Sequence, residues 1–519
     1  MKKINSLKIL FSIALVFTFA SCDKGFVELN KDPAALLTLD PGFLFSNAEI
    51  STPTGGWEQD QTITQQFVNA YNLGATTGFN FNTNNDNYNG NKWGAYGTPL
   101  RNLEQIIANT STDPTRNNLY QMARIWKSFN YMQIVDTYGY APYSEAEQAY
   151  LKNILYPKFD KDADIYTGIY NELKGAIAGL NPTGDRVTSD IFFGPLAVGP
   201  QVTAWKKLGW SLLLRLGMRY SKVDAAKAQS IVAEAFASGS LMSSNSDNII
   251  ITYNGVNNYN NPVNAGPRAT NPYYYYMAEP FVTQLTSTND PRSKYIIGKY
   301  ANPNAILTTN PDTAIASQIG FPIGYDQNSV SKKSDFQGTA TSGSGFKYSQ
   351  LNYNTFGSAL APTLLVTYSE TQLLLAEAAF RGWIAGGLVT ATAYYNAGIR
   401  ANMDEMTLYP GAAAIPDANY QSYIRQTSVS LLTGNELQKI NTQYWIASLS
   451  NGAEDWANLR RSGFPVLPKN PTVAPLPGDG YIHRMAYPVG IRNTSIDAYN
   501  AAVAAMGGDD LTQHVFWDK

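Results

Sequence analysis

The sequence is poor in cysteine, and this scarcity limits how the chain can be stabilised. Cys22 is the only cysteine among the 519 residues, so the chain cannot form an internal disulfide. A protein without disulfides has to bury a large apolar core, and this chain is long enough to do so.

Histidine is also scarce, which excludes several classes of enzyme. The chain has two histidines, His483 and His514, and no H-E-x-x-H motif, so a zinc-hydrolase site lacks its ligands. It has no G-x-S-x-G turn for a serine nucleophile. It also lacks a Walker loop and a G-x-G-x-x-G motif, which would hold nucleotide phosphates. We therefore predict no catalytic residue, no metal site and no cofactor.

Charged residues make up only 15% of the chain, and the two signs nearly balance at 38 basic and 40 acidic residues. No basic block is present, so we predict no nucleic-acid partner. Aromatic residues make up 13%, including 34 tyrosines, and asparagine is abundant. Many of these rings will pack in the core, but rings beside amide groups also suit neutral, hydroxyl-rich ligands.

The N-terminus is typical of a secreted lipoprotein. Lys2, Lys3 and Lys8 are followed by an almost wholly apolar run at 9–20, shorter than the ~20 residues that span a bilayer. The small residues before Cys22 resemble a lipobox. We predict a signal peptide over 1–21 and lipid attachment at Cys22; simple secretory cleavage nearby is the alternative. No other stretch is apolar enough to span a membrane.

Apolar residues at three- and four-residue steps predict long amphipathic helices. The clearest covers 117–138, where Gly139 ends the pattern and Pro142 follows. Further helices are predicted at 164–180, 202–220, 224–237, 367–381, 391–403, 435–449 and 453–460. They form four helix–turn–helix units with small residues at the crossings, and such units bury their apolar faces by stacking.

The predicted fold class is mainly α, with tetratricopeptide-like helix pairs forming a scaffold that carries long loop-rich insertions. The length suits about three average domains, but a repeat scaffold can extend further, and we predict a single domain over 22–519. The insertions lie near 51–98 and 240–362 and are rich in Asn, Gly and aromatic residues. We expect loops there, with short strands at most. Binding residues often lie in such loops on a rigid frame.

An acidic motif at Asp160, Asp162 and Asp164 imitates the start of a calcium loop. Ile165 stands where that loop needs glycine, and Asn171 stands where it needs a bidentate glutamate. We therefore interpret these acids as the N-terminus of a helix, where negative charge is favourable.

The paired carboxylates of a glycosidase are not recognisable by spacing, because the two residues are often distant in sequence. Glu145 and Glu147 are the nearest candidates. Since charged side chains are mostly exposed, we interpret both as surface residues after the turn at Pro142.

Several sequence motifs follow one another along the whole chain. In order, they are FVELNKDP at 26–33, DTYGYAPYS at 136–144, YSETQLLLAEA at 368–378, YNAGI at 395–399, GAEDW at 452–456, LRRSGFP at 459–465, RMAYP at 484–488 and FWD at 516–518. These motifs resemble those of the SusD/RagB family of nutrient-binding outer-membrane lipoproteins. Single pieces are weak, but together and in order they are specific.

The resemblance implies a helical SusD-like fold and a lipid-anchored protein that faces outward from the outer membrane. It implies docking on a SusC-like TonB-dependent barrel and delivery of oligosaccharide or peptide cargo to its pore. It also implies a binding protein and not an enzyme. Within the shared motifs, Glu370 and Glu377 lie on one helical face, and Arg460 and Arg461 are candidate partners across helices because buried charges require partners.

Candidate ligand-binding residues come from the aromatic and amide groups of the two insertions. Five rings are candidates for holding sugar faces, and four polar residues are candidates for bonding hydroxyls: Trp57, Tyr88, Trp93, Tyr259 and Tyr275, with Asn82, Asn85, Asp86 and Arg268. Trp93 and Tyr96 lie near a W-x-x-x-Y-like helix start of the family with different spacing, so a scaffold role is their alternative.

Three other functions remain open at this point. The first is binding of a peptide cargo in place of an oligosaccharide. The second is hydrolysis of glycans by a lipid-anchored enzyme, and the third is stabilisation of a partner complex without binding of a small molecule.

Overall fold

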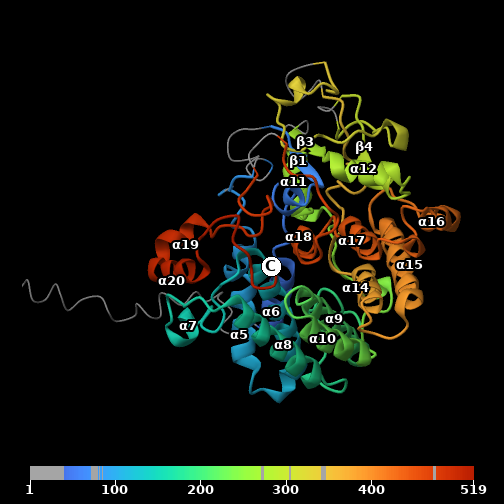
Figure 1. Cartoon of the computed structure of the whole chain (residues 1–519). Helices are drawn as coiled ribbons and strands as arrows, with labels where there is room; N and C mark the ends of the chain where they lie inside the picture. The colour runs from blue at the N-terminus through green and yellow to red at the C-terminus, as the bar shows by residue number, and fades with distance from the viewer. Residues whose placement is uncertain are drawn as a thin grey trace, which may run out of the picture.

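The computed structural model describes residues 40–71, 80, 82–84, 86–269, 274–302, 306–339, 346–471 and 475–519. The predicted signal peptide, Cys22 and Asn85 lie outside these residues. Figure 1 shows a body built mostly of helices. The mainly α fold class is therefore confirmed.

The helix predicted over 117–138 is α6 (Asn117–Tyr138). Its apolar stripe, including Met122, Trp126 and Phe129, is buried. The helix ends where Gly139 has a φ of 74°, a conformation that glycine adopts without the strain a Cβ would cause.

The other predicted helices are present, with ends that differ by a few residues. They are α8 (Asp162–Gly179), α9 (Val198–Arg219), α10 (Ala225–Ala237), α14 (Tyr368–Phe380), α15 (Gly387–Glu405), α17 (Glu436–Ala447) and α18 (Gly452–Ser462). They pack as the pairs α6–α8, α9–α10, α14–α15 and α17–α18, and successive pairs touch through α8–α9, α9–α14 and α14–α17. The four predicted units therefore form one stack (Figure 1).

Glycines let the paired helices approach closely. A Cβ at Gly217 of α9 would lie 2.9 Å from the side chain of Ile231 in α10. A Cβ at Gly398 of α15 would lie 2.8 Å from the side chain of Leu373 in α14 and 3.2 Å from the carbonyl of Ser369. These contacts confirm the expectation of small residues at the crossings.

Several helices lie outside the predicted units. They are α3 (Pro41–Ile50), α4 (Asp60–Ile63), α5 (Pro99–Thr110), α7 (Ala149–Lys152), α16 (Asp417–Ile424), α19 (Val489–Thr494) and α20 (Ile496–Met506). Helices α3 and α5 pack on each other and α5 packs on α6, so they extend the stack at its N-terminal side.

The two insertions meet through a short antiparallel pair. Strand β1 (Phe67–Asn69) of the first insertion pairs with β3 (Tyr275–Met277) of the second, with Val68 opposite Tyr276. Two further pairs join β2 (Ile249–Ile251) to β6 (Thr363–Val366) and β4 (Ile297–Gly298) to β5 (Gln350–Leu351).

The expectation of loops with short strands at most is wrong for both insertions. The first contains α4, and the second contains α11 (Pro262–Ala269), α12 (Glu279–Ser287) and α13 (Ser293–Ile296). These helices are too short for a three- to four-residue period to stand out from the surrounding turns. In α12, for example, Phe281, Val282 and Leu285 alone form the buried face.

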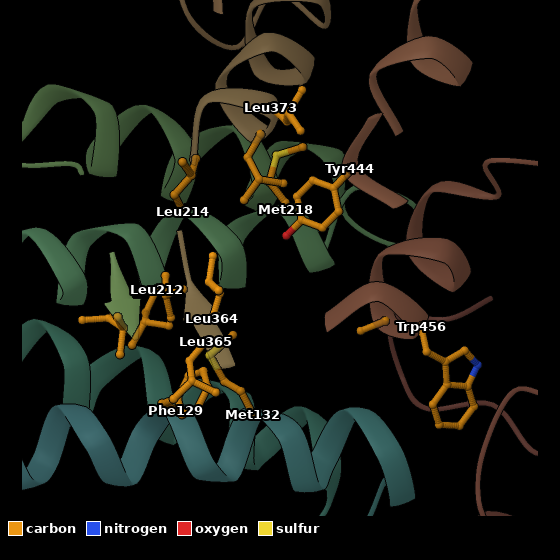
Figure 2. Packing of buried hydrophobic residues seen from close by; sticks show 14 of the residues in the cluster. Phe129, Met132, Leu212, Leu214, Met218, Leu364, Leu365, Leu373, Tyr444 and Trp456 are labelled. Carbon is orange, nitrogen blue, oxygen red and sulfur yellow. The ribbon is translucent and has the colours of Figure 1, made fainter. Parts of the chain in front are cut away.

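Most buried apolar side chains belong to one cluster that runs from Phe45 to Trp517. Figure 2 shows its centre, where Phe129 and Met132 of α6 lie near Leu364 and Leu365 of β6, with side chains of α9, α14, α17 and α18 around them. A second, smaller cluster contains Val68 and Tyr276 together with Phe321 and Phe346, so it is built by the two insertions.

Buried ion pairs tie the helix pairs together. The guanidinium of Arg461 donates to both carboxylate oxygens of Glu377 at 2.8 Å, which confirms that predicted pairing. Glu370 pairs instead with Arg215 of α9, at 2.6 Å to each oxygen.

The expected pairing of Arg460 with one of these glutamates is wrong. Its guanidinium donates to the carbonyls of His483 and Asp136 and lies over the Trp456 ring at 3.9 Å. The side chain points toward the C-terminal segment, away from α14, because α18 presents residues 460 and 461 on different faces.

Among the described residues, no helix has both the length and the apolar character needed to cross a membrane.

Candidate ligand-binding site

Two of the predicted ligand residues meet around an unpredicted carboxylate. The hydroxyls of Tyr88 and Tyr275 both hydrogen-bond Glu58, and Nδ2 of Asn69 donates to Glu58 Oε1 at 3.2 Å. These residues come from both insertions, and the β1–β3 pair brings them together. We call Glu58, Tyr71, Tyr88, Tyr274 and Tyr275 the tyrosine cluster.

Tyr71 and Tyr274 extend this cluster with a stacked ring pair. Their ring centroids lie 3.9 Å apart at an interplanar angle of 13°, and Tyr274 lies 6.3 Å from Tyr275. Both side chains are partly exposed. Tyr71 lies two residues after β1 and Tyr274 immediately precedes β3. Their position depends on the pairing of these strands, which could not be predicted from the sequence.

Glu58 is a hydrogen-bond acceptor in a site that is partly shielded from water. Burial raises the pKa of Glu58, while the donors Tyr275, Tyr88 and Asn69 act in the opposite direction. Burial and the neighbouring Glu58 raise the pKa of Tyr88, so its hydroxyl stays protonated as a donor. The groups that act on Glu58 are thus hydrogen-bond donors, so the cluster has the parts of a binding site for polar ligands.

Trp57 and Arg268 contact residues outside the tyrosine cluster. Trp57 is 2% exposed; its ring packs on Phe67 at 5.1 Å and its Nε1 donates to Asn264. Arg268 of α11 donates to the carbonyls of Tyr353 and Gly357. The Trp57 ring is therefore covered by its neighbours, whereas Arg268 is partly exposed and has one nitrogen, Nη1, engaged by the two carbonyls; the ligand contacts expected of both stay predictions.

Trp93 lies in a different place, with its ring against Tyr138, Phe159 and Tyr487. It is 9% exposed, so the ring faces are covered by neighbours. This placement fits the scaffold role that the sequence left as its alternative.

Tyr259 is partly exposed and Asp86 is exposed, and each has contacts of its own. The Tyr259 ring contacts Tyr253 at 5.2 Å, in the turn between β2 and α11. Asp86 accepts hydrogen bonds from Asn84 and Asn89 and lies 3.5 Å from the guanidinium of Arg492.

Asn82 lines a separate hollow of about 190 Å³. This hollow is bordered by Asn80 and Asn82 of the first insertion, by Ile323 of the second, and by residues of α18 and the segments at 463–470 and 479–483. The described part of the chain therefore places Asn82 beside the C-terminal region, and Asn85 lies outside that part.

The remaining acidic candidates have local contacts. Asp162 and Asp164 lie in the first turn of α8, which confirms the helix-terminus interpretation for these two residues. Asp160 lies before the helix and accepts hydrogen bonds from Ser144. Glu145 accepts from the backbone of Lys158. Glu147 is half-buried, and burial raises its pKa to about 7, while Arg101 opposes this shift.

Comparisons with known proteins agree on one family. The family model described as SusD-like, starch-binding and associating with the outer membrane, matches residues 33–488. A solved structure named as a chitin-binding protein is 27% identical, with a TM-score of 0.76 over 92% of this chain and 100% of its own.

Other solved structures share the fold. A SusD-like protein of the Bacteroidetes is 26% identical, with a TM-score of 0.77 over 93% of this chain and 100% of its own. A chitin-binding SusD homologue from Flavobacterium johnsoniae is 21% identical, with a TM-score of 0.71 over 92% of this chain and 97% of its own. No curated protein sequence matches the chain significantly.

Proposed function

Since the chain belongs to the SusD-like family of starch-binding proteins that associate with the outer membrane, we propose that it captures oligosaccharides at the cell surface. It holds them without cleaving them and passes them to a SusC-like TonB-dependent barrel. The lipid on Cys22 tethers it to the outer membrane, facing outward.

The observation that carries this proposal is the tyrosine cluster at the junction of the two insertions. Partly exposed rings provide flat apolar faces for the C–H faces of a sugar. Glu58 and the tyrosine hydroxyls beside them accept and donate hydrogen bonds to sugar hydroxyls. The chitin-binding name of a relative at 27% identity supports a glycan as the ligand.

The expected affinity is modest. Each net hydrogen bond contributes about 0.5–1.5 kcal/mol, so a few bonds and one or two rings give roughly −4 to −8 kcal/mol, a millimolar to micromolar dissociation constant. Release to a transporter requires such weak retention.

The test is glycan binding by the wild type, Tyr88→Ala and Glu58→Gln, using chitin and starch oligosaccharides in titration calorimetry. Tyr88→Ala removes a ring and a hydrogen bond, and Glu58→Gln removes the charge of a hydrogen-bond acceptor. Each change costs about 1–2 kcal/mol, so we expect both variants to bind about 5–30-fold more weakly. The control is Tyr150→Ala in α7, where the tyrosine is 89% exposed; α7 lies apart from β1 and β3 in Figure 1.

Other results would redirect the proposal. Glycan binding that is unchanged in both cluster variants would reject this placement of the site. Binding of a peptide panel in place of glycans would identify a peptide importer. New reducing ends on incubation with polysaccharide would support the hydrolase, and recovery of a barrel protein without any binding of glycan or peptide would support a purely structural role.

A further inference from the structure

The two histidines of the chain, 31 positions apart in the printed sequence, lie against each other. Their rings are 3.7 Å apart between centroids at an angle of 32°. The backbone N–H of His483 donates to the carbonyl of Leu511 at 2.8 Å, which fixes the segment of His483 beside the C-terminal segment. The fold therefore places the only two histidines of the sequence side by side.

Carboxylates flank the rings on two sides. Nδ1 of His483 lies 2.6 Å from Oδ2 of Asp518, and its Nε2 lies 2.8 Å from Oδ1 of Asp479. Nδ1 of His514 lies 3.6 Å from the same Oδ2 of Asp518. One ligand atom from each of His483, His514 and Asp518 lies within 4.8 Å of the others.

A neutral His483 ring cannot donate to both carboxylates, so this arrangement needs one further positive charge, either a second proton on the ring or a metal ion. A neutral imidazole carries one N–H, so it can donate to only one of two carboxylates. If Nε2–H donates to Asp479, the lone pair of Nδ1 faces the carboxylate of Asp518, and that contact is repulsive unless a proton or a metal ion lies between them.

We propose that His483, His514 and Asp518 bind a divalent cation of the zinc class. Imidazole nitrogens with a carboxylate oxygen form a ligand set that suits zinc, and they do not suit calcium or magnesium, which prefer oxygen ligands. Asp479 is a positioning residue that holds the His483 ring through Nε2, as carboxylates commonly do for metal-bound histidines.

The ligand atoms have to rearrange to accept the ion. Zinc bonds of about 2.0–2.2 Å in a tetrahedron place ligand atoms roughly 3.3–3.5 Å apart. Nδ1 of His514 donates to the backbone carbonyl of Asp518 at 2.5 Å, so the ring binds the ion through Nε2 or after this hydrogen bond breaks. The His483–Asp518 separation must widen by roughly 0.7 Å, which the partly exposed His514 side allows.

Asp518 has two positively charged neighbours, which set the charge of the site. Asp518 is nearly fully buried. The guanidinium of Arg460 is close enough to the Asp518 carboxylate to act on it electrostatically. Lys222 Nζ lies 3.8 Å from Oδ1 of Asp518, on the oxygen away from the rings, and together with Arg460 it limits the affinity.

The 190 Å³ hollow gives access to the ion, since Asp479, His483 and Asp518 are part of its wall. The ion would have three protein ligands and one position directed to that hollow. It would also clamp the C-terminal segment to the segment at 479–483. The proposal is independent of the glycan site, which uses other residues.

The test uses the whole protein, purified without a histidine tag and first treated with a chelator. Zn²⁺ uptake is measured by equilibrium dialysis with elemental analysis, and Co²⁺ is added as a spectroscopic probe of ligand type and tetrahedral geometry. We expect one Zn²⁺ per chain, a raised thermal midpoint, and a Co²⁺ spectrum typical of a tetrahedral site.

Variants separate ligands from neighbours. His514→Ala is the main variant, because this side chain is 43% exposed and its loss should leave the fold intact. It should abolish uptake, Asp479→Asn should weaken binding by about 10–100-fold, and Asp510→Asn in the same segment should bind like the wild type.

Two results would overturn the proposal. The first is absence of Zn²⁺ uptake by the wild type, which would make the histidine pair a protonated bridge between two carboxylates. The second is uptake that persists in His514→Ala with an unchanged Co²⁺ spectrum, which would place the metal elsewhere.

Discussion

Replacing Arg461 with Met tests whether the buried pair with Glu377 is needed for the packing of α14 against α18. Arg461 is 1% exposed and Glu377 is fully buried. Without the guanidinium, the carboxylate loses two charge-assisted hydrogen bonds at 2.8 Å and stays in the core.

The magnitude follows from two independent arguments. Removing one partner of a buried ion pair costs about 3–5 kcal/mol because the remaining charge is uncompensated. Burial would raise the pKa of Glu377, but Arg461 and Arg381 lower it to about 2. A shift from 4.5 to about 2 corresponds to about 3 kcal/mol of stability. This stability is present above pH 4.5 and is lost as the pH falls towards 2.

The assay is thermal unfolding at pH 7, followed by calorimetry. For a chain of this length the unfolding entropy is about 1 kcal/mol per kelvin, so Arg461→Met should lower the Tm by roughly 3–5 °C. The matched control is Arg381→Met, which removes a second arginine from the same carboxylate. Arg381 is 27% exposed, so we expect a cost of about 1 kcal/mol or less.

A double variant decides the reasoning. Glu377→Leu combined with Arg461→Met removes both charges, so it should be more stable than Arg461→Met alone. If the double variant is as unstable as the sum of the single changes, or if the two arginine variants behave alike, the argument from an uncompensated charge is refuted.

Three further predictions follow from the same structure. Gly398→Val should destabilise the protein by about 1–3 kcal/mol, because the new side chain would clash with Leu373 across the α14–α15 crossing; urea unfolding measures this, and an unchanged midpoint would contradict it. Burial raises the pKa of Glu405 to about 7, so its contribution to stability is present below pH 4.5 and lost as the pH rises through 7. Glu405→Gln should therefore stabilise the protein more at pH 8 than at pH 4, by up to about 3 kcal/mol, and equal effects at both values would count against the assignment. Cys22→Ser should move the protein from the membrane fraction to the soluble fraction, as immunoblotting of fractionated cells would reveal; retention at the membrane would mean another anchor.

The helical scaffold was predictable because its signals are local and long. In α6 the apolar period continues over 22 residues and a glycine marks its end, so the structure agrees with the predicted bounds. The pairing of Arg461 with Glu377 was predictable as well, since both lie in motifs of the resembled family and buried charges need partners.

The binding site was only partly predictable, because it depends on contacts between distant segments. Tyr88 and Tyr275 were expected from composition, but Glu58, which joins them, was not expected. Burial of Trp57 could not be distinguished from exposure, because an aromatic ring in a loop-rich segment serves equally well as core. Likewise, nothing in the spacing of His483 and His514 indicates that they touch.

The β1–β3 pair has a consequence for how specificity changes between relatives. The two insertions share a strand ladder and a small apolar cluster, so neither can be exchanged without disturbing the other's backbone pairing. Chimaeras that receive both insertions from one relative should fold and acquire the ligand preference of that relative. Chimaeras that receive only one insertion should lose the backbone pairing between β1 and β3. Divergence in what such proteins recognise would then proceed by coordinated replacement of both segments upon an unchanged helical stack.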